Sequence, residues 1–236
     1  MLPDDVLLAV FIDFCADEDE LFKKEIETWQ TLVHVCRRWQ CVVFGSPRRL
    51  NLQLVCGAKT PARDTLDVWP ALPLVIQCFP GIGIENVDNI VAILEHSNRV
   101  RRINLLKVSR SDFENISAAM QVPFPELTHL DLWSYDEMRV LPDSFLGGFA
   151  PCLRFLEFDG IPFPGLPNLL LSATHLVGLN LVRIPHSGYF SPETMATALS
   201  KLTSLQSLSL EFESPRSCLT RQPDVRLVRH TSSSPF

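Results

Sequence analysis

The 236-residue chain lacks most of the motifs that carry chemistry. Its seven cysteines form no C-x-x-C pair and no cluster with histidines at zinc-ligand spacing, so no metal site is predicted. No H-E-x-x-H or Walker motif occurs, and the G-x-G at Gly81 lacks the third glycine of a phosphate-binding loop, which favours a turn. No cofactor is therefore expected. A membrane span is not expected either, because no run of about 18 apolar residues is present.

An excess of basic charge is also missing. The chain has 21 Lys and Arg against 27 Asp and Glu, a net charge of −6. Nucleic-acid binding depends on concentrated Lys and Arg, so no nucleic-acid partner is predicted. The cysteines lie in apolar runs, which is typical of reduced core thiols, and the first residues lack the basic region of a signal peptide. We therefore expect a globular protein of the cytoplasm or nucleus.

Residues 2–14 have the pattern of a helix that begins at once. Pro3 suits the first helical position, and Asp4 and Asp5 suit the positive end of the helix dipole. Apolar residues then recur at spacings of three and four, at Val6, Leu7, Val10, Phe11 and Phe14. The acidic run 17–20 that follows predicts a solvated loop.

Residues 29–44 carry apolar side chains over an unusually wide arc. On a helical wheel these side chains fill roughly 200°, whereas a helix on one core needs only about 100°. Three readings fit this arc: a helix buried on two sides, two short helices broken near Cys36, or a face reserved for a partner. Arg37 and Arg38 lie on the polar side and are interpreted as solvated charges. Trp29 is interpreted as a core residue.

Together these two segments resemble the F-box, a three-helix motif. The resemblance is carried by Leu2-Pro3-Asp4-Asp5-Val6-Leu7 and by Val35-Cys36-Arg37-Arg38-Trp39, although the spacer between them is long and acidic. The resemblance implies docking on a Skp-type adaptor and, through it, on a cullin–RING ubiquitin ligase. The adaptor-binding residues that it implies are Leu2, Pro3, Val6, Leu7, Val35, Cys36 and Trp39.

The rest of the chain contains a repeat. Five segments have the form L-x-x-L-x-L, and they begin at Val100, Leu127, Leu153, Leu176 and Leu205. Their last apolar positions, 105, 132, 158, 181 and 210, are 27, 26, 23 and 29 residues apart. This spacing is typical of leucine-rich repeats, in which each unit has a short parallel strand with a helix or turn behind it. Segments 50–54 and 72–76 are interpreted as irregular earlier members. The predicted fold class is an α/β solenoid.

The segments between the strands are predicted to form the convex side. Helices are expected at 84–94, at 113–120 and from the Ser191 N-cap to residue 202. In regular repeats the third position after the last leucine is Asn or Cys, which satisfies buried backbone in the turn. Here that position is occupied by Val108, Tyr135, Ile161, Ile184 and Glu213. The substitution predicts an irregular solenoid with uneven curvature.

Alternation along the strands predicts which residues face outward on the concave side, because the leucines point into the core. The predicted target-binding face consists of Arg102, Asn104, His129, Asp131, Phe155, Glu157 and Asn180, with Gly178, Ser207 and Ser209 beside them. Phe155 is the best candidate anchor, or else a partly covered side chain that packs on its neighbours. His129 and Asp131 have no Ser or Cys nucleophile identifiable beside them, so they are interpreted as surface polar residues and no catalytic site is predicted.

The whole pattern predicts three parts: an F-box-like helical module at 1–46, a leucine-rich-repeat-like solenoid at 47–213, and a disordered or truncated tail at 214–236. The F-box segments, the degenerate repeats and the I-P-x-x-G turns at Ile161 and Ile184 resemble the large fungal family of F-box proteins with leucine-rich-repeat-like domains. This resemblance implies a non-enzymatic adaptor that recruits an unknown target protein to a Skp–cullin–F-box ligase. The alternative is a freestanding repeat scaffold whose N-terminal helices only cap the solenoid.

Overall fold

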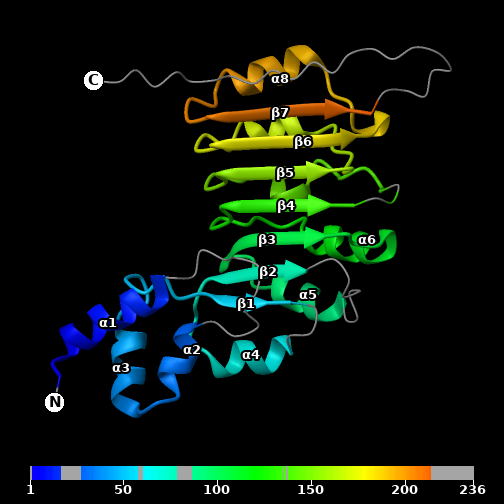
Figure 1. Cartoon of the computed structure of the whole chain (residues 1–236). Helices are drawn as coiled ribbons and strands as arrows, with labels where there is room; N and C mark the ends of the chain where they lie inside the picture. The colour runs from blue at the N-terminus through cyan, green and yellow to red at the C-terminus, as the bar shows by residue number, and fades with distance from the viewer. Residues whose placement is uncertain are drawn as a thin grey trace, which may run out of the picture.

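The computed structural model describes residues 2–16, 28–57, 61–78, 87–134, 136 and 138–213. In this part of the chain, seven parallel strands form a single sheet in chain order, with helices packed behind it, which is an α/β fold (Figure 1). The strands are β1 (Leu54–Cys56), β2 (Leu74–Cys78), β3 (Val100–Leu106), β4 (His129–Trp133), β5 (Phe155–Asp159), β6 (Gly178–Ile184) and β7 (Ser207–Phe212). Every segment that the leucine pattern predicted as a strand overlaps one of them, so the strand predictions are confirmed.

Short helices and turns connect the strands on the other face of the sheet. They are α4 (Ala62–Val68), α5 (Val87–Leu94), α6 (Arg110–Ala119), α7 (Leu166–Leu170) and α8 (Pro192–Leu199), with 3-10 turns at Phe145–Gly148 and His186–Gly188. The three predicted helices correspond to α5, α6 and α8. The Ser191 hydroxyl accepts a hydrogen bond from the Thr194 amide at 3.4 Å, which confirms the predicted N-cap.

The strands are aligned so that apolar side chains stack on apolar side chains. One stack joins Cys56, Ile76, Ile103, Leu130, Leu156, Leu179 and Leu208. The next joins Cys78, Leu105, Leu132, Phe158, Leu181 and Leu210. These side chains are buried in β1 to β6, and each large one contributes about 1.5–3 kcal/mol relative to an exposed position. In β7 they are only half-buried, because no further described strand covers that edge.

The turns that follow the strands differ from those of a regular repeat. Val108, Ile161 and Ile184 are buried at the position where a polar side chain would satisfy the backbone. Successive turns bond to one another instead: the Lys107 amide donates to the Trp133 carbonyl at 2.8 Å, and the Gly160 amide donates to the Val182 carbonyl at 3.0 Å. These backbone bonds satisfy the turn amides without a polar side chain. The register also shifts in β2 and in β6, whereas Tyr135 lies outside the described residues.

Three helices precede the sheet: α1 (Asp4–Ala16), α2 (Thr28–Val33) and α3 (Arg37–Gly45). The break between α2 and α3 confirms the reading of residues 29–44 as two short helices. Trp29 is buried, as predicted, and its Nε1 donates to the Gln53 carbonyl at 3.1 Å. Its ring also meets that of Trp69 edge-on at 5.2 Å, so the helical module packs against the β1 end of the sheet (Figure 1).

One prediction about the cysteines is partly wrong, and three others concern residues outside the described ranges. Cys56 and Cys78 are buried, but Cys36, Cys41 and Cys152 are exposed, so the prediction of core thiols is wrong for these three, because apolar neighbours in sequence do not by themselves bury a residue. The acidic run 17–20, the Gly81 motif and the tail 214–236 lie outside the described residues. Among the helices that are described, none is long and apolar enough to cross a membrane.

The stacked core predicts that truncation of Phe158 strongly lowers the stability of the fold. Phe158 is fully buried, and its ring centroid lies 6.3 Å from those of Phe145 and Phe163. We expect Phe158→Ala to lower the free energy of unfolding by about 3–5 kcal/mol, because it removes apolar contacts and leaves a cavity. Phe149→Ala is the matched control. Phe149 is 53% exposed, so its loss should cost less than about 0.5 kcal/mol. Urea unfolding followed by circular dichroism measures the stability of both variants. Equal losses of stability would contradict the placement of Phe158 in the core.

Candidate functional site

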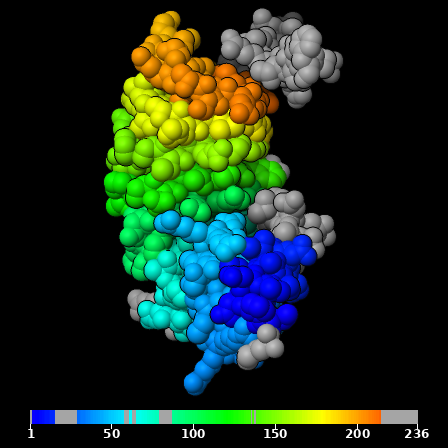
Figure 2. Space-filling view, turned by 90° about the vertical axis from the view of Figure 1, so that its left-hand side faces the viewer, coloured from blue at the N-terminus to red at the C-terminus, as the bar shows by residue number. Residues whose placement is uncertain are grey.

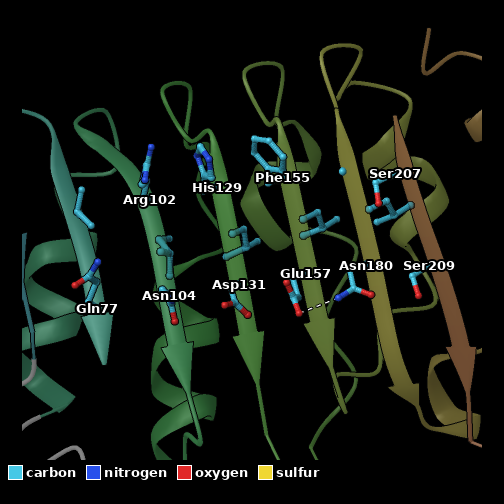
Figure 3. A pocket seen from close by; sticks show the side chains of 16 residues that line it. Gln77, Arg102, Asn104, His129, Asp131, Phe155, Glu157, Asn180, Ser207 and Ser209 are labelled. Atoms are coloured by element: carbon cyan, nitrogen blue, oxygen red, sulfur yellow. Dashed lines mark hydrogen bonds between the residues drawn. The ribbon is translucent and has the colours of Figure 1, made fainter. Parts of the chain in front are cut away.

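A groove of about 700 Å³ crosses the open face of the sheet from β2 to β7 (Figure 3). Two rows of side chains line it, separated by the buried apolar residues between them. The first row, toward the starts of the strands, consists of Val75, Arg102, His129, Phe155, Gly178 and Ser207. The second row, two residues further along each strand, consists of Gln77, Asn104, Asp131, Glu157, Asn180 and Ser209.

The structure brings all seven predicted target-face residues into this groove. The prediction missed Val75 and Gln77, which extend both rows by one strand. They alternate with Leu74, Ile76 and Cys78 along β2, although Val75 is itself buried, and Gln77 lies just beyond the predicted segment 72–76. Whether the face binds a target stays a prediction.

A flat aromatic platform occupies the middle of the first row. The rings of His129 and Phe155 stack at a centroid distance of 4.8 Å with planes 25° apart. The Phe155 ring extends over Gly178, where a Cβ would approach it to 3.0 Å, so the glycine leaves room for the platform. Phe155 is nevertheless 41% exposed. It is therefore both packed on its neighbours and available to a ligand.

His129 is uncharged at neutral pH. Its ring is half-buried, and its Nδ1 lies 2.8 Å from the Thr128 hydroxyl. Burial, together with the positive charges of Arg102 and Arg154, lowers the pKa of His129 to about 4. The platform therefore presents a neutral imidazole beside a phenyl ring, with the Arg102 guanidinium on one side in the first row (Figure 3).

Negative charge gathers in the second row. Asp131 of β4 pairs in register with Glu157 of β5. Burial and the charges of Glu157 and Asp159 raise the pKa of Asp131 to about 7. Asn180 Nδ2 donates to Glu157 Oε1 at 2.8 Å, as the dashed line in Figure 3 marks. Asp159 differs, because it forms an ion pair with Arg183 at 2.6 Å.

The groove places half-buried titratable side chains beside an exposed aromatic ring. His129 and Asp131 lie on the open face, but they are half-buried, and strands distant in sequence supply the burial and the charges that shift their pKa values. The hydroxyls among the lining residues, Ser207 and Ser209, belong to β7, three strands from His129. Within the described ranges, no group of three or more His, Cys, Asp or Glu residues is placed to hold a metal ion.

Helix α1 carries a second candidate surface. Its core face buries Leu7, Leu8 and Phe11. The adjacent face, together with the residue just before the helix, bears an apolar stripe, defined as Leu2, Val6, Val10 and Phe14, whose exposed fractions are 55%, 43%, 53% and 52%. These residues recur every four positions and so follow one side of the helix. Figure 2 shows α1, in blue, open at the surface of the molecule.

The predicted adaptor-binding residues divide into two sets. Exposed ones are Leu2, Pro3, Val6, Val35 and Cys36. Leu7 is only 6% exposed, and the half-buried Trp39 packs on Phe11 with a ring distance of 4.8 Å. The Arg38 guanidinium pairs with Asp4 at 2.6 Å and donates to the Leu2 carbonyl, which ties the start of α3 to the start of α1. Val10 and Phe14 were not among the predicted residues, although their spacing of four would have placed them with Val6.

The two titrating groups of the groove oppose each other in the pH dependence of stability. The folded pKa of Asp131, about 7, exceeds its ordinary 3.8, so its contribution to the free energy of unfolding is lost as pH rises from about 4 to about 7. The folded pKa of His129, about 4, lies below its ordinary 6.5, so its contribution is lost as pH falls from 6.5 to about 4. In the wild type the two effects partly cancel.

We therefore expect Asp131→Asn to reveal the histidine effect. The free energy of unfolding of this variant should rise more steeply with pH than that of the wild type between pH 4 and 7. Above pH 7 the variant should be more stable by roughly 1 kcal/mol, a value reduced for solvent screening of a partly exposed carboxyl. Urea midpoints measured across this pH range test the expectation. A wild-type profile in the variant would contradict the assigned neighbours of Asp131.

Comparison with known proteins adds no assignment to these two surfaces. No protein-family model matches the chain, and no curated protein is similar to it at a significant level. The function is therefore inferred from the groove and from the exposed face of α1.

Proposed function

We propose that this protein is a substrate-recognition adaptor of a Skp–cullin–F-box type ubiquitin ligase. In this proposal residues 1–46 form the F-box-like module and residues 47–213 form a leucine-rich-repeat-like solenoid. The module binds the Skp-type adaptor, and the groove binds a target protein. The chain itself then performs no chemistry and acts by holding the target near the conjugating enzyme.

The observation that carries the proposal is the apolar stripe of α1. The core face of this helix is already buried by Leu7, Leu8 and Phe11, yet the adjacent face exposes Val6, Val10 and Phe14, with the exposed Leu2 just before the helix. A helix that only caps a domain needs one apolar face. A second apolar face exposed to water has no use in the isolated chain and is typical of a protein–protein contact.

The repeated sheet supports the other half of the proposal. Each strand lies beside the preceding one and parallel to it, and β3 to β6 pair without a register shift, as expected for a solenoid. The groove crosses β2 to β7, whereas the apolar stripe is on a helix packed beyond β1 (Figure 1). The two surfaces share no residue, so an adaptor and a target can be bound together.

A freestanding scaffold is the second candidate, because the N-terminal helices do cover the end of the sheet. Trp29, Phe44 and Trp69 form an aromatic cluster there, with ring distances of 5.2 to 6.3 Å. This cluster accounts for the inner sides of α2 and α3. It does not account for the exposed side of α1, which distinguishes the two candidates.

Binding to a Skp-type adaptor tests the proposal. We expect Val10→Asp and Phe14→Asp each to weaken binding by on the order of 10- to 100-fold, because a carboxylate would be buried in an apolar contact. Val68→Asp is the matched control: Val68 is 73% exposed on α4, so the same substitution there should leave binding unchanged. Leu7 is unsuitable for this test, since its burial makes a charged substitution there a test of folding.

Isothermal titration of the purified chain against the adaptor provides the measurement, with circular dichroism to show that each variant is folded. Absence of binding by the wild type would overturn the proposal in favour of the capping role. Undiminished binding by both folded α1 variants would overturn it as well.

A further inference from the structure

The second row of the groove offers hydrogen-bond acceptors that the protein does not fully use. Asn104 Oδ1 is buried and has no hydrogen-bond partner. It lies in register with Asp131, which lies in register with Glu157. In the described part of the chain, neither carboxylate has a basic side chain within ion-pair distance, unlike Asp159 with its Arg183. A ligand that satisfies this row has to donate several hydrogen bonds and carry positive charge.

The first row adds an apolar surface at a distance from the carboxylates that the stem of one long side chain can span. His129 and Phe155 precede Asp131 and Glu157 by two residues on the same strands, a separation of roughly 7 Å along the strand. A side chain that spans the rows therefore needs an apolar stem of that length and a cationic head. The Arg102 charge in the first row repels a cation there and favours the orientation with the head on the second row (Figure 3).

The separation of the two carboxylates favours a guanidinium over an ammonium group. Asp131 and Glu157 stand on adjacent strands, which lie roughly 4.8 Å apart. A guanidinium is planar and carries five N–H donors in a fixed fork, so it can donate to two carboxylates at once, whereas an ammonium is a compact point charge. Arginine also packs its stem and its plane on aromatic rings.

We propose that the groove binds an arginine side chain in an extended segment of the target protein, with its aliphatic stem over the His129–Phe155 platform and its guanidinium between Asp131 and Glu157. The identification of the bound segment as part of a ligase target rests on the proposed function. The arginine site itself does not, because it is defined by the groove alone.

The site makes binding depend on pH. The charged neighbours of Asp131 are Glu157 and Asp159 on β5, and those of His129, two residues earlier on β4, are Arg102 on β3 and Arg154 just before β5. Because the pKa of Asp131 is about 7 and that of His129 is about 4, Asp131 changes charge between pH 6 and 8 while His129 stays neutral. The cation binds the ionised carboxylate, so affinity should rise by about tenfold between these pH values.

The test uses the full chain and three small probes: Nα-acetyl-arginine amide, Nα-acetyl-lysine amide and Nα-acetyl-citrulline amide, which has the shape of arginine without its charge. Chemical-shift titration by NMR should show saturable binding of the arginine probe, with shifts in β4 and β5. The citrulline probe should bind at least tenfold more weakly and the lysine probe should be intermediate. Only the affinity of the two charged probes should rise with pH.

The variants Asp131→Asn and Glu157→Gln, singly and combined, should reduce arginine affinity by tenfold or more and remove the pH dependence when Asp131 is changed. Asp88→Asn, an exposed acid on α5, is the matched control and should bind as the wild type does. Equal affinity for arginine and citrulline, or full binding by the folded double variant, would overturn the proposal. Adaptor binding by the double variant should remain intact, so a failure of the arginine site is distinguished from a failure of the ligase role.

Discussion

The structure depends on one constraint, the in-register stacking of apolar side chains across parallel strands. The stack from Cys56 to Leu208 fixes the position of each strand against the next. Because side chains alternate between the faces of a strand, a slip by one residue would turn this stack outward and expose it to water. The buried stack therefore also determines which residues face the groove. The two rows of the groove stay aligned because the apolar side chains between them are packed in the core.

That alignment explains the electrostatics of the groove. The strands hold the half-buried Asp131 and Asp159 close to the exposed Glu157, whereas an isolated peptide would separate these carboxylates in solvent. The protein accommodates the repulsion by ion-pairing Asp159 with Arg183 and by raising the pKa of Asp131 until the carboxyl is only partly ionised at neutral pH. A bound cation would relieve the remaining repulsion, which links ligand binding to proton release. His129 stays neutral beside these acids, because the positive charges of Arg102 and Arg154 would repel a charged imidazole.

The N-terminal helices solve a different problem, because a stacked sheet exposes apolar surface at its ends. Trp29 closes the β1 end by packing on Trp69 and bonding to the Gln53 carbonyl. This contact needs only the inner sides of α2 and α3, so α1 retains an outer face for other use. The physical basis of the proposed adaptor contact is that the capping residues and the exposed apolar residues lie on different sides of the helical module. At the β7 end the leucines remain half-buried in the described residues, so the two ends of the sheet are not equivalent.

The sequence alone determined the seven strands and most of the groove, because these follow from local periodicity, whereas the break between α2 and α3 was one of three readings that it left open. A leucine at every second position is enough to tell the inner from the outer face, and so Asn104, Asp131 and Phe155 could be assigned before their surroundings were known. Only the tertiary structure decided the burial of Leu7, the exposure of Val10 and Phe14, the apolar turns at Val108 and Ile161, and the shifted pKa values of His129 and Asp131. Each of these depends on residues more than 20 positions away that chain order does not place, since burial and charge act through space and periodicity acts along the chain.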